Sequence, residues 1–545
     1  MKKIGKIVET IERKRLLFSL IASLIFSTFL LVGAEITVHG RTEWSLAYFL
    51  RFLAIFVVLA LLFYAIFNIK IAEKNDKITI PRWKIFLILI IPSIFLLWAV
   101  YPGIFSWDSG VMYHYYATGE YTTHFSLIIS WLLGFCVNVG RNLFGSDNIG
   151  LALFLLIQII AANIAITEAI HYLSKKLKSK PFLIVCVIYF ITHLLIQNML
   201  ITAHQDVIFG SFIVLLGLEF VKMVEDESYF TKKKNWLKVG LFVFLMCAVR
   251  NNGFFALIPT LLIGFIFFKG NRKNFLFILL LPTLVFQGYK HLIVNKIVVY
   301  NEPTVRESLN VPILQIARTM YYTKDKSFDD RLYPFFGNCN WDLYKTSFDL
   351  SDDFKECMNN LHMTSHKMEF VSLWAEIGLK YPEYYFDAPF ALTQKLFYPW
   401  TKYNHDESSY RYHTYAHHSI SYEVMREWDG VGVAKIKEEP NIPILKKILK
   451  VILTKQYWGE IYGFRIIWSG AFTTSLVIIV ILFALYNKLY NYMAPLGLIF
   501  GVLLTVALAP TVFFRYMFPV VISFPIMAYV LVKSITKDKK QKKKK

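Results

Sequence analysis

The sequence predicts a mainly α protein, a polytopic bundle of transmembrane helices that carries a mixed, mainly helical domain outside the membrane. Three observations lead to this prediction. The 545-residue chain is 56% hydrophobic, and apolar runs close to twenty residues long recur along it, which is the length that crosses a bilayer as a helix. Basic residues gather in the short segments that flank these runs. One long stretch, residues 295–465, is too polar to span and should fold at the membrane surface.

The positive charge of the chain is unevenly distributed. The formal net charge is +21, but residues 295–465 hold 21 Lys and Arg against 22 Asp and Glu. The excess therefore lies next to the apolar runs, a pattern that orients membrane helices and attracts anionic lipid headgroups. A basic arm at residues 1–15 and a lysine tail at residues 533–545 fit this pattern. We expect membrane lipids, and no nucleic acid, among the partners.

The basic flanks predict about twelve crossings, with both termini in the cytoplasm. The basic arm directs the first crossing outward, and the direction alternates along the chain. The expected crossings are Leu16–Ala34, Ser45–Phe67, Ile85–Val100, Ile149–Tyr172, Phe182–Met199, Val207–Val224, Leu237–Val249, Phe254–Phe268, Phe275–Val294, Ile466–Tyr486, Met493–Ala509 and Pro519–Val532.

One further apolar segment is expected not to cross. The basic loop "SKKLKSKP", Ser174 to Pro181, must be cytoplasmic, and it would be outside if both preceding apolar segments crossed. The segment Phe125–Phe144 is short and is interrupted by glycines, an asparagine and an arginine, which suits an interfacial or re-entrant helix. We therefore expect it to lie on the outer face as a juxtamembrane helix.

The chain divides into five expected parts. They are a cytoplasmic basic arm (1–15), an N-terminal transmembrane bundle (16–294) that includes an outer loop (101–126), an extracytoplasmic domain (295–465), C-terminal transmembrane helices (466–532) and a cytoplasmic lysine tail (533–545). No internal repeat is apparent, so nothing supports the inverted-repeat architecture of many transporters. Cys339 and Cys357 share the extracytoplasmic domain, but spacing alone leaves open whether they are bonded.

On this topology, polar residues collect at the outer ends of the crossings. Charge near bilayer depth is costly and usually faces a cavity or a substrate path, although a single arginine at a helix end is also a common anchor. Carboxylates can accept a proton from an attacking hydroxyl, and guanidinium groups bind phosphate. The carboxylates are Asp108, Glu120 and Asp206, and the cations are Arg250, Lys290, Arg318 and Arg515. Together they suit group transfer from a phosphate-linked, membrane-embedded donor.

The stretch "YPGIFSWDSGVMYHYYATGEYTTHFSLI", which begins at Tyr101, carries a family resemblance. A span that ends in an aromatic-rich loop with an acid, followed by an interfacial helix and many spans, resembles the GT-C superfamily of polyprenyl-phosphate-sugar-dependent glycosyltransferases. The stretch is similar to a group of bacterial GT-C-like membrane proteins with the approximate pattern Pro-Gly…Asp-Ser…Gly…His-Pro…Leu. The matching residues are Pro102, Gly103, Asp108, Ser109, Gly119, His124 and Leu127, and Phe125 replaces the usual proline.

Four later segments add to this resemblance. "HQDVIFGSF" is similar to a Trp-Lys-Asp element that opens a later span, "RNNGFFAL" to an Arg-x-Asn-Gly element, "ESLNVPILQIAR" to a segment that enters the outer domain, and "RYMFP" to the outer start of the last span. The matching residues are Asp206, Arg250, Asn252, Gly253, Pro312, Gln315, Arg318 and Arg515. His204 and Gln205 stand where tryptophan and lysine are usual, so a cationic role is not implied there.

The resemblance implies an integral-membrane glycosyltransferase of the GT-C type. Such an enzyme would move a sugar from a polyprenyl-phosphate donor to a cell-surface glycan or lipid acceptor, on the outer face of a bacterial cell membrane. Asp108 would be the base that activates the acceptor hydroxyl. The expected substrate-binding residues are His124, Asp206, Arg250, Asn252, Gln315, Arg318 and Arg515. Some GT-C enzymes bind a divalent cation and others do not, so no cofactor or metal ligand is assigned.

Several alternatives stay open. A transporter or flippase of lipid-linked sugars would also need polar residues near the bilayer, and a glycan polymerase or ligase would show a similar cationic outer face. Asp108 in "WDSG" could equally be a helix cap or a turn residue. His413 and His417 have the i, i+4 spacing of a zinc-binding pair on a helix, but no third ligand is evident, and aromatic stacking or packing explains this Tyr- and His-rich segment more simply.

Overall fold

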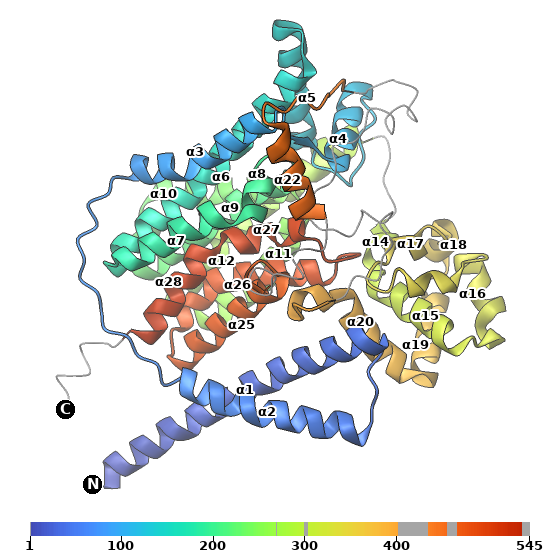
Figure 1. Ribbon diagram of the computed structural model, residues 1–545, viewed down its shortest axis with the longest axis horizontal. Coiled ribbons are helices and arrows are strands. Elements are labelled where there is room, and N and C mark those ends of the chain that lie inside the picture. Colours follow the sequence, from blue (N-terminus) through green and yellow to red (C-terminus); the bar gives the residue numbers. More distant parts are fainter. Residues whose placement is uncertain (1, 269, 299–303, 402–433, 455–465, 537–545) are drawn as a thin grey trace.

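The computed structural model describes residues 2–268, 270–298, 304–401, 434–454 and 466–536. This part of the chain is built almost wholly of helices (Figure 1). The helices are α1 (Lys2–His39), α2 (Leu46–Ile66), α3 (Arg82–Ala99), α4 (Trp107–Thr118), α5 (Leu127–Phe144), α6 (Asp147–Leu177), α7 (Lys180–Thr192), α8 (Leu194–Leu200), α9 (Gln205–Glu225), α10 (Lys233–Val249), α11 (Asn252–Phe267), α12 (Arg272–Tyr289), α13 (Asn295–Ile297), α14 (Thr304–Ser308), α15 (Asn310–Thr323), α16 (Asp329–Phe336), α17 (Asp352–Lys355), α18 (Asn360–Ser365), α19 (Lys367–Lys380), α20 (Pro382–Phe397), α22 (Pro443–Thr454), α25 (Gly470–Tyr486), α26 (Met493–Ala507), α27 (Phe514–Ile522) and α28 (Phe524–Ile535). Short 3-10 turns span Tyr229–Thr231, Lys326–Phe328, Trp341–Lys345 and Tyr490–Tyr492, and a π-helical turn spans Lys290–Val294.

Helix α9 lies at the centre of the bundle. It packs against α6, α10, α26 and α27, and 78% of its most apolar window is buried inside the protein. Residues 207–218 of this helix carry no charged side chain, as expected of a helix that is surrounded on every side. The chain therefore builds its core around α9 and keeps the charges of this helix at the two ends.

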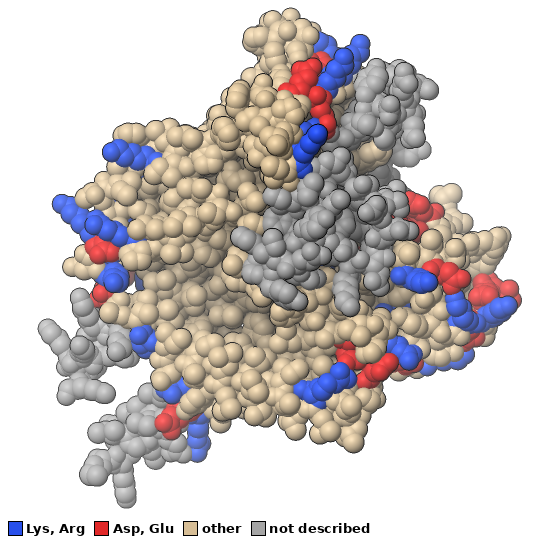
Figure 2. Space-filling model, viewed as in Figure 1, with Lys and Arg blue, Asp and Glu red and all other residues tan. Residues whose placement is uncertain are grey.

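The outer helices of the bundle face away from the core with apolar side chains. Only 6% of the apolar window of α2 and 28% of that of α12 are buried. The exposed residues of these helices are large hydrophobic ones, such as Leu61 and Leu284. Figure 2 shows the same feature as a broad surface without charge, with Lys, Arg, Asp and Glu confined to its margins. Such a surface suits a lipid environment, so the chain is a membrane protein.

The predicted number of twelve crossings is not confirmed. Among the described residues, eight helices are long and apolar enough to cross a membrane, or up to ten if the bent pairs α7–α8 and α27–α28 each count as one span. Three predicted crossings correspond to α10, α11 and α25, which are 16 or 17 residues long. At 1.5 Å per residue such helices reach only about 25 Å, which is less than a typical hydrocarbon core.

Helix α5 lies beside the N-terminal part of α6. Just before α5, Ser126 donates a hydrogen bond of 2.8 Å to a carbonyl near the C-terminal end of α10, and near the other end Gly140 packs directly on Gly150 of α6. The contact between α6 and the start of α9 lies at Gln158, whose side-chain amide donates to a carbonyl of the chain just before α9. Helix α5 therefore extends away from the bundle. This agrees with the expectation for Phe125–Phe144, although α5 is itself long and apolar enough to cross, so non-crossing stays a prediction.

The segment that was predicted to be extracytoplasmic contains a small helical domain with its own core, formed by α14 to α19 (Figure 1), which we call the outer domain after that prediction. Ile313, Phe335, Phe354 and Phe370 are among its fully or almost fully buried residues. A disulfide joins Cys339 to Cys357, whose Cα atoms are 5.4 Å apart, so the question that spacing left open is resolved.

The rest of the segment 295–465 does not continue this small domain. Helix α20 packs against α15 of the domain but also against α1 and α25 of the bundle. Residues that precede α22 run along the C-terminal end of α3, where the amide of Ile442 donates to the carbonyl of Ala99 at 2.9 Å. The predicted domain thus comprises a compact unit and connecting segments that return to the membrane helices.

Candidate active site

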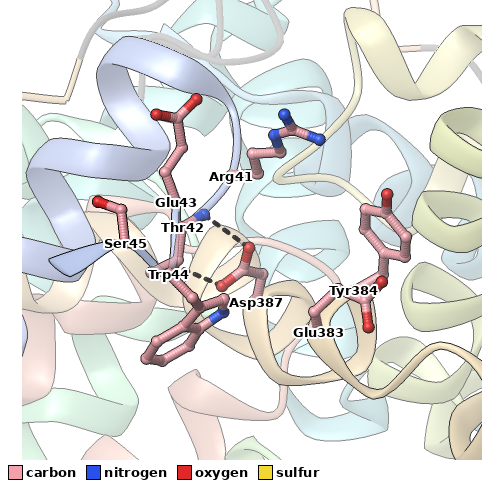
Figure 3. A pocket seen from close by; sticks show the side chains of 8 residues that line it. All are labelled: Arg41, Thr42, Glu43, Trp44, Ser45, Glu383, Tyr384 and Asp387. Atoms are coloured by element: carbon pink, nitrogen blue, oxygen red, sulfur yellow. Dashed lines mark hydrogen bonds between the residues drawn. The ribbon is translucent and has the colours of Figure 1, made fainter. Parts of the chain in front are cut away.

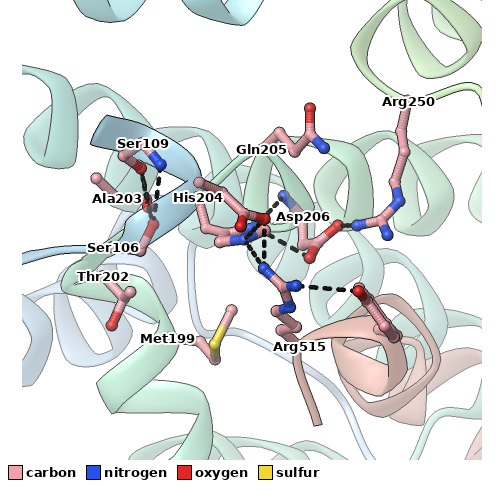
Figure 4. A network of polar contacts seen from close by, with 12 residues as sticks. Ser106, Ser109, Met199, Thr202, Ala203, His204, Gln205, Asp206, Arg250 and Arg515 are labelled. Atoms are coloured by element: carbon pink, nitrogen blue, oxygen red, sulfur yellow. Dashed lines mark hydrogen bonds and ion pairs between the residues drawn. The ribbon is translucent and has the colours of Figure 1, made fainter. Parts of the chain in front are cut away.

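Asp108 lies in the first turn of α4, where the helix is fastened to the chain that precedes α9 (Figure 4). Strand β1 (Ile104–Phe105) pairs in parallel with β2 (Thr202–Ala203). Ser106 caps α4 by accepting the amide of Ser109 at 3.3 Å, and its hydroxyl donates to the carbonyl of Ala203 at 2.7 Å. Because Ser106 is the cap, Asp108 is not needed for capping. The carboxylate at this position faces α9 and α27 instead.

His204 joins the carboxylates of Asp108 and Asp206. Its Nε2 is 3.0 Å from Oδ2 of Asp108, and its Nδ1 is 3.0 Å from Oδ2 of Asp206. Burial lowers the pKa of His204 to about 4, so the imidazole is neutral near pH 7 and carries one proton. In one tautomer, Nδ1 accepts the amide of Asp206 (3.3 Å) and Nε2–H donates to Asp108. In the other, Nδ1–H donates to the carboxylate of Asp206 and Nε2 accepts from Nη1 of Arg515, so the neutral imidazole donates to one of the two acids at a time.

Arg515 brings the first cation into this network. It lies in the first turn of α27 and forms an ion pair with Asp108. Its Nη1 is also 2.7 Å from Nε2 of His204, and its Nη2 donates to the hydroxyl of Tyr516 at 3.0 Å. The side chain of Arg515 is only 10% exposed, and that of Asp108 is 15% exposed. The carboxylate therefore stays reachable from the surface although it is held by a guanidinium.

Arg250 brings the second cation. It terminates α10 with an extended backbone and forms an ion pair with Asp206 in the first turn of α9. Its guanidinium carbon lies 4.9 Å from the ring centre of Tyr516, and that of Arg515 lies 4.7 Å from the same ring. Cation–π contact with one shared tyrosine holds the two guanidinium groups close together. Helices α4, α9, α10 and α27 thus meet in a single polar network, which we call the Asp108 network.

A cavity lies against Arg250 at the C-terminal ends of α10 and α12. Its polar lining residues include His124, Gln205, Arg250, Asn251 and Lys290. Phe286 and Leu127 are among the apolar lining residues. Two permanent cations and a histidine around one cavity suit an anionic ligand such as a phosphate. We call this feature the cationic cavity, and it shares Arg250 with the Asp108 network.

The structure does not bring Arg318 to this site, which corrects the prediction that it binds the donor phosphate. Arg318 is entirely buried in the outer domain, where Nη2 lies 3.0 Å from Asp387 and 2.9 Å from the carbonyl of Gly40. Its Nη1 donates to the hydroxyl of Tyr344 at 2.6 Å. A guanidinium that is fully enclosed and engaged in this way is not accessible to a phosphate, so Arg318 fastens the outer domain to the loop between α1 and α2.

Asp387, the partner of Arg318, lies in the wall of a surface pocket between that loop and α20 (Figure 3). Its two carboxylate oxygens accept from the amide of Thr42 at 2.8 Å and from the Thr42 hydroxyl at 2.6 Å. Gln315 is also structural: its amide donates to the carbonyl of Tyr385, and its oxygen accepts the indole N–H of Trp374. The predicted substrate-binding role of Gln315 is therefore corrected as well.

Two other predicted positions lie beside the site and not in it. Asn252 begins α11, and its neighbour Asn251 lines the cationic cavity and donates to the carbonyl of Thr123 at 3.1 Å. Glu120 is exposed in the turn after α4. The length of this helix, roughly 16 Å, separates it from Asp108. Of the predicted residues, Asp108, Asp206, Arg250 and Arg515 meet in the Asp108 network, and His124 lies in the adjoining cavity.

The sequence interpretation missed the central role of His204 and the shared ring of Tyr516. His204 was identified only as a departure from a family pattern, although a histidine that precedes an acid at the start of a span is itself a signal of a polar site. His413 and His417 lie outside the described residues.

Comparisons with known proteins find one similar family and assign no chemistry. Residues 112–329 match the model of a family of unknown function, DUF6020. No curated protein and no solved structure matches the chain. The matched segment contains Asp206, Arg250, Lys290 and His124 but neither Asp108 nor Arg515. Over this segment, which includes the cationic cavity and the centre of the bundle, the chain is similar to the DUF6020 family.

Proposed function

We propose that the protein is an integral-membrane glycosyltransferase that moves a sugar from a polyprenyl-phosphate donor to a glycan or lipid acceptor on the outer face of a bacterial cell membrane. One observation carries the proposal: the cationic cavity shares Arg250 with a network that contains a partly exposed carboxylate, Asp108. A phosphate site and a candidate base therefore adjoin at the end of a membrane bundle. The sequence resemblance to GT-C enzymes points to the same chemistry.

The surroundings of the cationic cavity suit a lipid-linked anion. Its walls come from α10, α12 and the residues before α5. Both α5 and α12 expose large apolar side chains, among them Phe135, Leu284 and Val285. A polyprenyl chain could lie along such helices while its phosphate reaches Arg250 and Lys290, because each part of the donor meets a surface of matching polarity.

The proposed reaction uses Asp108 and the cations in separate roles. The acceptor oxygen forms a bond with the anomeric carbon of the sugar as the bond from that carbon to the phosphate oxygen breaks. The proton of the acceptor hydroxyl passes to the carboxylate of Asp108, and the polyprenyl phosphate leaves with its negative charge balanced by Arg250 and Lys290. Arg515, which pairs with Asp108 in this structure, would turn toward the donor phosphate when the donor binds.

A transporter or flippase is the alternative from another class. It would need polar groups along the path of the sugar through the bilayer. The central helix α9 has no charged residue between positions 207 and 218. Its carboxylates lie at the ends, with Asp206 on one side and Glu219 and Glu225 on the other, which favours chemistry at one face.

The experiment is an assay of the purified protein with polyprenyl-phosphate sugars and a set of glycan and lipid acceptors. We expect release of free polyprenyl phosphate coupled to glycosylation of an acceptor. Lys290→Gln should raise the KM for the donor roughly 10-fold, because one phosphate contact is lost, whereas His291→Gln, on the exposed neighbouring position, should not. Movement of the intact lipid-linked sugar across vesicles without phosphate release would indicate a flippase. Exclusive use of diphosphate-linked glycans would indicate a polymerase or ligase.

A further inference from the structure

Two histidines and a glutamate converge at the junction of α18 and α19, in the small outer domain. His362, His366 and Glu369 each offer a ligand atom, and these three atoms lie within 4.8 Å of one another. The two imidazole rings are stacked, with centres 4.1 Å apart. In a zinc site with bonds of about 2.0–2.1 Å, neighbouring ligand atoms are roughly 3.4 Å apart. A metal ion lies in the plane of each imidazole that binds it, so the exposed ring of His366 would have to turn out of the stack for both histidines to bind one ion.

The hydrogen bonds of His366 set the tautomer that a metal ligand requires. Its Nδ1 lies 3.2 Å from the main-chain carbonyl of His362 and 2.9 Å from the hydroxyl of Ser365. A carbonyl oxygen can only accept, so Nδ1 carries the proton and Nε2 keeps a free lone pair. Fixing one ring nitrogen on a backbone carbonyl is the arrangement that orients histidine ligands in metal sites.

His362 contributes a buried nitrogen with no assigned partner. Among the described residues, its Nε2 is enclosed but makes no hydrogen bond. Such an atom is costly unless it is satisfied by something else, and a metal ion would satisfy it. The ring is fixed in place by Phe335 of α16, at a centre-to-centre distance of 4.8 Å. His362 is thus preorganised, whereas His366 and Glu369 are exposed and free to adjust.

Glu369 supplies the negative charge of the cluster. The nearby cation, Arg331, is engaged in a two-pronged ion pair with Glu376 at 2.7 and 2.9 Å. Within the described part of the chain, no hydrogen bond or ion pair holds the carboxylate of Glu369, so it can turn toward the histidines. Imidazole nitrogens favour zinc-class ions, and calcium and magnesium prefer oxygen ligands alone.

We propose that His362, His366 and Glu369 form a binding site for a divalent transition-metal ion of the zinc class. The ion clamps the end of α18 to the first turn of α19 and holds the corner of the outer domain that rests on α16. Three protein ligands leave a fourth position for water. The site is independent of the Asp108 network, from which none of its ligands comes.

A second cluster of possible ligands provides a matched control. Glu35, His39 and Glu43 also place ligand atoms within 4.8 Å. Here Glu35 is already committed, because its carboxylate pairs with Arg51 at 2.9 Å and accepts the amide of Glu43. A cation would have to compete with this guanidinium, so we expect the site at His39 to bind metal much more weakly.

The test measures Zn²⁺ binding to the full-length protein, purified in detergent with a histidine-free tag and stripped with a chelator. Compared with wild type, His366→Ala and Glu369→Gln should each bind Zn²⁺ at least 10-fold more weakly at one site. His39→Ala should bind as wild type does. Co²⁺ should give visible absorption bands in the wild type that His366→Ala lacks. His362→Ala is avoided, since it removes packing against Phe335.

Thermal unfolding distinguishes the loss of a metal ligand from misfolding of the variant. Added Zn²⁺ should raise the Tm of stripped wild-type protein and leave that of His366→Ala unchanged, because a ligand that binds only the folded state stabilises it. Without metal, the two proteins should unfold at the same temperature. Unchanged Zn²⁺ binding in both His366→Ala and Glu369→Gln, or loss of the same binding in His39→Ala, would overturn the proposal.

Discussion

Two arginine–aspartate pairs of this protein differ in a way that residue type does not reveal. Arg515 and Asp108 come from distant parts of the chain, and so do Arg318 and Asp387. The side chain of Arg318 is completely buried and that of Asp387 is 3% exposed, whereas Asp108 is 15% exposed. Enclosure makes the pair of Arg318 and Asp387 a structural clamp, and partial access leaves the pair of Arg515 and Asp108 available for chemistry.

The partners of the two pairs differ as well. Asp387 receives hydrogen bonds from the Thr42 amide and hydroxyl in addition to Arg318, so the charge of each group is balanced locally. Asp108 belongs to a larger network in which a second carboxylate, a second guanidinium and a neutral imidazole are linked. Networks with several alternative partners can rearrange when a charged ligand arrives, whereas a closed pair cannot do so without unfolding.

The largest expected effect is on stability, from Arg318→Ala. Removing this guanidinium leaves the carboxylate of Asp387 buried without its cation, which typically costs about 3–5 kcal/mol. We therefore expect a much lower free energy of unfolding, measured by chemical denaturation of the detergent-solubilised protein. Arg331→Ala is the matched control, because the ion pair of Arg331 with Glu376 is exposed, and its loss should change stability little. Equal stability of the two variants would show that the clamp is not structural.

The next effect is on activity, from Asp108→Asn. Asparagine keeps the shape and most hydrogen bonds of the side chain but cannot accept the proton of the acceptor hydroxyl. We expect glycosyl transfer to fall by about 10²-fold or more. The thermal unfolding temperature should also fall, because Arg515 loses its counter-charge, but by less than in Arg318→Ala, since Asp108 is partly exposed. Glu120→Gln, at the exposed far end of α4, should retain activity. Near-normal turnover of Asp108→Asn would assign Asp108 a structural role and make Asp206 the next candidate base.

The sequence predicted the membrane bundle because long apolar runs and basic flanks are local properties. It also identified Asp108, Asp206, Arg250 and Arg515, since charges at the ends of spans are conspicuous. Their meeting could not be derived from the sequence. It depends on the pairing of two strands of only two residues each, Ile104–Phe105 and Thr202–Ala203, and strands that short leave no periodic pattern.

The misassignment of Arg318 has a related cause. Its partners, Asp387, Tyr344 and the carbonyl of Gly40, lie far from it in the sequence, so burial of the guanidinium could not be foreseen from "ESLNVPILQIAR". Likewise, the spacing of Cys339 and Cys357 did not show that they are bonded. Contacts within one helix or loop were predictable, and contacts set by packing of distant segments were not.

A smaller effect on donor use is expected from Arg250→Lys and Arg515→Lys. Lysine keeps the positive charge but loses the planar fork that binds two phosphate oxygens at once, and it packs less well on the ring of Tyr516. Each variant should lower kcat/KM for the donor by roughly 10-fold, with the loss mainly in KM. The same conservative change at Arg318 should lower stability and leave the KM for the donor unaltered. Wild-type kinetics in both network variants would favour the interpretation of these residues as membrane anchors.

The last effect concerns the pH dependence of stability and isolates His204. Burial holds the pKa of His204 at about 4, below its ordinary value of 6.5. Between these two values the unfolded chain binds a proton at this position and the folded protein does not. The contribution of His204 to the free energy of unfolding is therefore fully present above pH 6.5 and is lost as the pH falls toward 4.

His204→Gln keeps hydrogen-bonding groups between Asp108 and Asp206 but cannot titrate. The Tm of the wild type should therefore fall more steeply than that of His204→Gln between pH 6.5 and 4.5, as measured by thermal unfolding in detergent. Parallel slopes for wild type and His204→Gln would mean that the imidazole is not held neutral, and that the two carboxylates of the Asp108 network are joined by a charged histidine.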